Sequence, residues 1–220
     1  MTWGDVKLIA LQTMFSNEGA VITVDDINQE YINAMPGKAN EAMQQISAVG
    51  RPILKEWHVK IAEGADEAVT DAMLTLPAAE KRYKISLRHY QPRFRNIDRG
   101  QVMLDDGDIY DVAEDWSLEG DDVLVIPGNV EGEYTVWYRA YPQTITAQTP
   151  DEETIDMPPD AAALIPLYIA AELYKEDELA MATVLRNEYE DGLQKLQAAW
   201  QAGSMSMRAE GVRNTTGWWR

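Results

Sequence analysis

The feature that most restricts the fold is a double change in the spacing of hydrophobic residues. Apolar residues recur every three to four positions up to about residue 50, alternate with polar residues from Trp57 onward, and return to the helical spacing after about residue 160. A period of 3.6 residues is that of an amphipathic helix, and a period of two is that of a half-buried strand. Helices, then strands, then helices indicate the α+β class rather than a doubly wound parallel sheet.

Three short helices are predicted at the start of the chain. Thr2 and Asp5 have the spacing of a capping box, which begins a first helix of about 14 residues. Asp25 or Asp26 can cap a second helix, which we expect Pro36 and Gly37 to end. A third carries an apolar stripe from Ala39 to Val49 and ends at Gly50 and Pro52.

The middle of the chain predicts an antiparallel sheet or small sandwich of roughly five or six short strands. The strongest run places Tyr134, Val136, Tyr138 and Ala140 on one face. Turn sequences such as Asp106-Gly107 separate the runs. The other predicted strands lie at 57–61, 83–87, 102–104, 109–112 and 123–126.

Two further helices are predicted after the acidic segment 149–160. Asp160 is a plausible cap for the first, and Pro166 either kinks this helix or marks its true start. The second runs from about residue 177 to 202, with an apolar seam at Ala182, Leu185, Tyr189, Leu193, Leu196 and Trp200.

The predicted organisation is a helical bundle of N- and C-terminal helices with an inserted antiparallel sheet or small sandwich and an extended C-terminal arm. Its parts are N-terminal helices at 1–55, the inserted β domain at 56–150, the C-terminal helix pair at 151–202, and the arm at 203–220.

Charge divides this chain into an acidic body and a basic end. The 37 acidic and 19 basic side chains give a net charge of −18, which opposes attachment to nucleic acid through a basic face. Residues 203–220 instead hold three arginines against one glutamate. This segment is either a frayed terminus or an arm that docks on a partner, because tryptophan and arginine are enriched among interface hot spots.

The sequence offers little chemistry for catalysis. It has no cysteine and only two histidines, His58 and His89, which we interpret as strand residues. The segment from Asp105 to Asp111 gathers four aspartates but departs from the EF-hand pattern, so a solvated hairpin turn is favoured over a metal site. No apolar run reaches the length of a membrane span and the start lacks a signal peptide, so we expect a soluble protein, and no cofactor or metal motif is found. Paired carboxylates for glycoside hydrolysis remain open, because their separation depends on the fold and not on the sequence.

The segment from Glu133 to Leu196 resembles the C-terminal half of the head-tail connector (adaptor) proteins of tailed bacteriophages. A strand ending in a Tyr-Pro pair leads through an acidic segment to two helices with LY..AELY..DE and RNEYE-like motifs, and the upstream phrase RFRNIDRGQVML is similar to the entry to the family's β domain. The matching positions are Tyr141, Pro142, Ile165, Pro166, Tyr168, Ala171, Glu172, Leu173, Tyr174, Asp177, Arg186, Asn187 and Tyr189.

The resemblance implies a non-enzymatic ring protein of the virion neck, commonly in twelve copies, which is assembled in the host cytoplasm. Its partners would be the portal protein, a tail or neck completion protein and its own copies, with DNA passing through without specific binding. The portal-docking arm would comprise Arg208, Arg213, Trp218, Trp219 and Arg220. The subunit packing helices would use Tyr168, Tyr174, Arg186, Tyr189, Leu193 and Trp200.

Two other interpretations remain open from the residues alone. The aromatic residues Trp116, Trp137, Tyr138 and Tyr141 could form a tail-associated module that binds a carbohydrate or a host receptor, although the alternation also suits core positions. The other is a hydrolase that uses the carboxylates of residues 105–111 with a bound metal ion.

Overall fold

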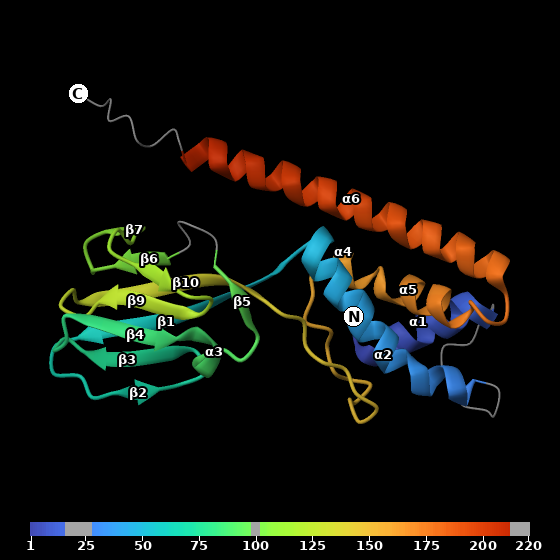
Figure 1. The fold of residues 1–220 in the computed structure, drawn as a ribbon, viewed down its shortest axis with the longest axis horizontal. Helices are drawn as coiled ribbons and strands as arrows, with labels where there is room; N and C mark the ends of the chain where they lie inside the picture. Colours follow the sequence, from blue (N-terminus) through green and yellow to red (C-terminus); the bar gives the residue numbers. More distant parts are fainter. Residues whose placement is uncertain (16–27, 98–101, 212–220) are drawn as a thin grey trace. The chain divides into compact units, whose positions relative to one another are not determined.

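The computed structural model describes residues 1–15, 28–97 and 102–211 and has the predicted α+β class. The chain divides into two compact units, a helical unit of Met1–Pro52 and Pro142–Arg220 and a β unit of Ile53–Tyr141 (Figure 1). The predicted β domain of 56–150 is therefore displaced at both ends. Residues 142–150 belong with the helices, because Ile145 is buried in the helical core and bonds Asn40 through its backbone.

The helical unit begins with the predicted capping box. The Thr2 amide donates to Asp5 Oδ2 at 2.8 Å, and the Asp5 amide donates to Thr2 Oγ1 at 3.2 Å. These bonds lower the pKa of Asp5. The helices of this unit are α1 (Trp3–Phe15), α2 (Gln29–Gln45), the π-helix η1 (Ile46–Gly50), α4 (Pro159–Ala162), α5 (Ile165–Leu173) and α6 (Leu179–Gly211).

Helix α2 corrects the prediction of two helices separated at Pro36 and Gly37. The helix passes through both residues and continues into η1. Met35, Ala39 and Met43 are fully buried, so one apolar stripe spans the proline. Burial of the two methionines, at about 1.5–3 kcal/mol each, offsets a proline cost of about 3 kcal/mol. The caps proposed at Asp25 and Asp26 lie outside the described residues.

The C-terminal helices pack on the N-terminal ones. Helix α5 contacts α1, α2 and α6, and Figure 1 shows α6 running along α5. Pro166 lies at the start of α5, which confirms the second of the two roles predicted for it. Asp160 lies within α4 and is not the residue that precedes it. Its Oδ1 accepts from the Ala161 amide at 3.1 Å, and its Oδ2 pairs with Arg51. The chain is helical as far as Gly211, so an extended arm beginning at residue 203 is wrong for 203–211.

The acidic segment 149–160 is bound to the start of α1. The Trp3 amide donates to the Glu153 carbonyl at 2.8 Å, and the Ile155 amide donates to the Met1 carbonyl at 3.1 Å. Lys7 pairs with Asp151 at 2.5 Å. Ile155 is buried in the core of the helical unit.

The β unit forms two sheets in the residues the structure describes, with more strands than predicted. Its elements are β1 (Ile53–Ala62), β2 (Ala68–Val69), β3 (Met73–Pro77), β4 (Arg82–Ser86), α3 (Leu87–Tyr90), β5 (Phe94–Asn96), β6 (Val102–Asp105), β7 (Tyr110–Val112), β8 (Ser117–Glu119), β9 (Val123–Pro127) and β10 (Gly132–Ala140). The larger sheet has the order β2-β3-β1-β10-β6-β7 with β5 also paired to β10, and the smaller has the order β4-β9-β8.

The larger sheet is mixed and not antiparallel throughout. Strand β1 pairs antiparallel with β10 but parallel with β3. The predicted alternation is confirmed on both central strands, because Trp57, Val59 and Ile61 of β1 and Tyr134 and Val136 of β10 are buried.

Candidate functional site

Two clusters of polar and aromatic side chains are candidates, one in each unit. In the helical unit, Arg186 of α6 lies between Glu172 of α5 and Glu190 of α6. Its Nη1 is 2.9 Å from Glu172 Oε1 and its Nε is 2.9 Å from Glu190 Oε1. The guanidinium also lies over the rings of Tyr168 and Tyr189, at 5.2 and 5.5 Å from their centroids.

The two tyrosines extend this cluster to α2. Their rings pack edge to face at 5.0 Å. The Tyr168 hydroxyl donates to Glu41 and accepts from Gln45 Nε2 at 3.1 Å, and the Tyr189 hydroxyl donates to Gln45 Oε1 at 3.3 Å. Burial raises the pKa of Tyr168 and raises that of Tyr189 to about 12. The hydrogen bond to Glu190 raises the pKa of Arg186.

The other predicted packing residues also face helices of their own chain. The Tyr174 hydroxyl donates to the Met14 carbonyl of α1. Leu193 packs against the core of the helical unit, and Trp200 is half-buried. The sequence reasoning missed Glu41, Gln45 and Glu172 as partners in this cluster, since α2 and α5 are far apart in the sequence and their polar residues give no local pattern.

The predicted docking arm lies almost entirely beyond the described structure. Arg208 falls on the last turns of α6, where the structure describes the backbone only. Arg213, Trp218, Trp219 and Arg220 lie outside the described residues.

The four-aspartate segment forms the predicted turn, a hairpin between β6 and β7. Asp105 Oδ1 accepts from the Gly107 amide at 2.9 Å, while Asp106 Oδ1 accepts from the Asp108 and Ile109 amides at 3.0 and 2.8 Å. Gly107 has a φ of 93°, which glycine adopts without strain. The hydrogen bonds from the Ile109 and Asp108 amides lower the pKa of Asp106. Among the described residues, no three carboxylates or histidines converge as metal ligands.

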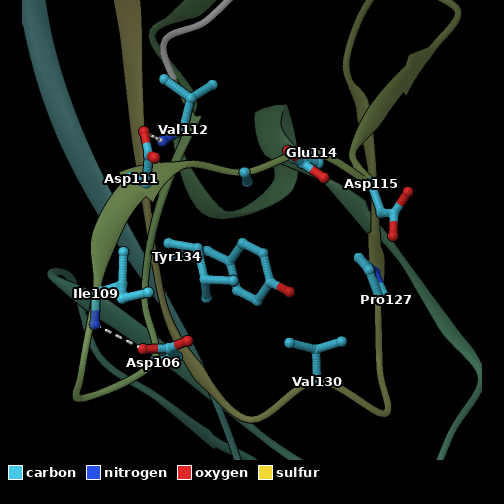
Figure 2. Close-up of a pocket in the computed structure, with 11 residues that line it drawn as sticks. Asp106, Ile109, Asp111, Val112, Glu114, Asp115, Pro127, Val130 and Tyr134 are labelled. Atoms are coloured by element: carbon cyan, nitrogen blue, oxygen red, sulfur yellow. Dashed lines mark hydrogen bonds between the residues drawn. The ribbon is translucent and has the colours of Figure 1, made fainter. Parts of the chain in front are cut away.

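A pocket of about 220 Å³ lies beside this hairpin in the β unit (Figure 2). Tyr134 forms its floor, and burial together with the charge of Asp115 raises the pKa of this tyrosine. Its apolar walls are Leu104, Ile109, Val112, Ala113, Pro127 and Val130, and its acidic residues are Asp106, Asp111, Glu114 and Asp115. The sequence reasoning missed this pocket, because it is assembled from three separate segments.

The aromatic residues proposed for ligand binding do not form one surface. Tyr138 is buried and donates to Gln91 Oε1 at 2.8 Å, whereas Trp137 and Tyr141 are 38% and 44% exposed. Trp116 is half-buried. His58 is on β1 as predicted, with Nδ1 2.8 Å from Glu133 Oε1, but His89 lies on the short helix α3 and not on a strand.

No family model matches the chain, and no curated protein is significantly similar to it. None of the helices in the described parts of the chain is both long and apolar enough to cross a bilayer.

Proposed function

We propose that this protein is a head-tail connector (adaptor) of a tailed bacteriophage. In this role it is a non-enzymatic ring component of the virion neck that joins the portal protein to the tail and lines the DNA exit channel. Its N- and C-terminal helices would form one bundle carrying the β unit as an insertion.

The observation that carries the proposal is the resemblance of residues 133–196 to connector proteins. The structure adds a physical role for the motif residues. Tyr168 and Glu172 of the first motif contact Arg186 of the second, so both motifs serve to pack α5 on α6. Motifs of this kind support an architecture more directly than an activity.

The charge of the chain is compatible with a DNA channel. A net charge of −18 repels the phosphates of a passing duplex, so DNA can move through a ring without being held. The ring would contain copies of this chain, twelve by family resemblance, between the portal and a tail or neck completion protein.

The decisive experiment is electron microscopy of particles from the phage carrying an early stop codon in this gene. Separate heads and tails, or heads that have lost their DNA, are expected for a connector. Intact tailed virions would overturn the proposal.

The C-terminal arm needs its own test. Because α6 extends to Gly211, the arm must begin later than residue 203. We propose that residues after Gly211, together with Arg208, dock on the portal. Trp218→Ala/Trp219→Ala should weaken binding of the full chain to purified portal, whereas Trp137→Ala, which removes an exposed indole of the β unit, should not. A chain ending at Ala202 that binds portal as tightly as the full chain would contradict the arm.

The exposed rings of Trp137 and Tyr141 favour one alternative, a tail-associated module that binds a carbohydrate or a host receptor. Intact virions that fail to adsorb to the host would support this alternative. The same Trp137→Ala variant would then lose adsorption, while the Trp218→Ala/Trp219→Ala variant would keep it.

A further inference from the structure

The pocket beside the β6–β7 hairpin is lined by a buried tyrosine, Tyr134, whose hydroxyl is bonded to no described residue and is open to the pocket. Tyr134 is 1% exposed, and its hydroxyl makes no hydrogen bond with any residue that the structure describes. Figure 2 shows this hydroxyl directed into the pocket, on the side of Asp115, Pro127 and Val130. A buried tyrosine normally bonds its hydroxyl, so the group is available to a ligand.

The acidic residues of the pocket differ in whether other described residues already donate hydrogen bonds to them. Asp106 accepts two backbone amides and Asp111 accepts the Val112 amide at 2.7 Å. Glu114 and Asp115 make no hydrogen bond or ion pair with described residues, and both line the pocket. Two carboxylates and one hydroxyl can therefore accept hydrogen bonds from an incoming cation.

The form of the pocket favours an organic cation over a metal ion. Its carboxylates do not converge as a metal site among the described residues. Its walls are largely aliphatic, and its floor is an aromatic ring. A guanidinium group suits such surroundings better than an ammonium, because it is planar, weakly hydrated and donates to two carboxylates at once.

We propose that this pocket binds the guanidinium group of an arginine side chain presented by a partner protein. Glu114 and Asp115 accept its N–H groups, the Tyr134 hydroxyl accepts another, and the aliphatic stem of the arginine lies against Val130 and Pro127. The proposal does not depend on the connector function, since it rests on the β unit alone.

The test is a titration of the isotope-labelled full chain with N-acetyl-arginine N-methylamide, followed by amide chemical shifts. We expect saturable shifts at residues 104–115 and 127–134 with a Kd of about 1–10 mM, which is reasonable for a fragment of this size. The citrulline analogue has the same shape without charge and should bind about tenfold more weakly, the equivalent of about 1.4 kcal/mol. The lysine analogue should fall between them.

Variants assign the binding to the named groups. Glu114→Gln/Asp115→Asn should weaken arginine binding about tenfold, and Tyr134→Phe, which removes an unpartnered hydroxyl, should weaken it about threefold. The matched control is Asp66→Asn/Glu67→Gln, which makes the same charge change at exposed residues outside the pocket and should leave the Kd unchanged.

Four results would overturn the proposal. Equal binding of the arginine and citrulline probes would remove the role of charge, and equal weakening by the control variant would make the effect non-specific. Tighter binding of free arginine than of the capped probe would indicate a small-molecule ligand instead of a protein side chain. Calcium ions that shift the same amides and displace the arginine probe would indicate a metal site.

Discussion

At the residue scale, Arg186 of α6 links its helix to α5 through an ion pair with Glu172 and a contact with the ring of Tyr168. Glu172 is only 10% exposed and pairs with both Arg186 and Lys175. Arg186→Met leaves this carboxylate with one cation and removes the guanidinium from two rings. We expect the free energy of unfolding to fall by about 2 kcal/mol, less than for a fully buried pair, because Arg186 is one-third exposed and Lys175 remains. Urea unfolding measures the change.

The matched control for this variant is Lys195→Met on the same helix. Lys195 pairs with Asp191 four residues earlier, and both side chains are well exposed. Its loss should change the free energy of unfolding by less than about 0.5 kcal/mol. Similar losses for the two variants would show that Arg186 contributes no more than a surface pair.

Tyr189 gives the folded state a dependence on alkaline pH. Its pKa is about 12 in the folded protein and 10.0 for an ordinary tyrosine, so the folded state keeps a proton that the unfolded state releases. The stabilisation is complete below pH 10 and is lost as the pH rises toward 12. Tyr189→Phe should flatten the fall in unfolding free energy over this range, whereas Tyr110→Phe, at an exposed tyrosine, should not. An unchanged slope in Tyr189→Phe would contradict the assignment.

At the element scale, one glycine inside α2 and one at the end of η1 have opposite roles. Gly37 lies inside α2 with nothing within 4 Å of an added Cβ, so Gly37→Ala should raise the free energy of unfolding by about 0.5–1 kcal/mol. At Gly50, an added Cβ would lie 2.8 Å from Leu193 Cδ1 and 3.0 Å from Leu196 Cδ2. Both atoms are end methyls of flexible side chains, so Gly50→Ala should lower the free energy of unfolding by about 1 kcal/mol, the low end of the cost of overpacking. Thermal unfolding of both variants checks the pair, and the same sign for both would contradict it.

The same elements show what local sequence can and cannot predict. The capping box and the alternation of β10 depend on neighbours along the chain, and both were predicted correctly. Helix α2 continues through Pro36 because Met35 and Met43 are buried against other helices, and rules based on neighbouring residues do not include such tertiary contacts. The parallel pairing of β3 with β1 was missed for the same reason, because the partner of a strand is set by the whole sheet. The pocket at Tyr134 is assembled from three separate segments of the chain, so no local sequence pattern predicts it.

At the scale of the whole molecule, the two units should fold separately. The β unit leaves and re-enters the helical unit at neighbouring points, since Ile53 of β1 and Ala140 of β10 are cross-strand partners. Partners of this kind are about 5 Å apart, so a linker of about four residues can replace 53–141. We expect the shortened chain to keep its helical circular dichroism and the fragment 53–141 to unfold cooperatively.

A fragment 64–141 is the control. It lacks β1, which lies between β3 and β10, and should not fold. If 53–141 also fails to fold while the full chain unfolds in one transition, the units are interdependent, and the connector architecture proposed here would need a different division of the chain.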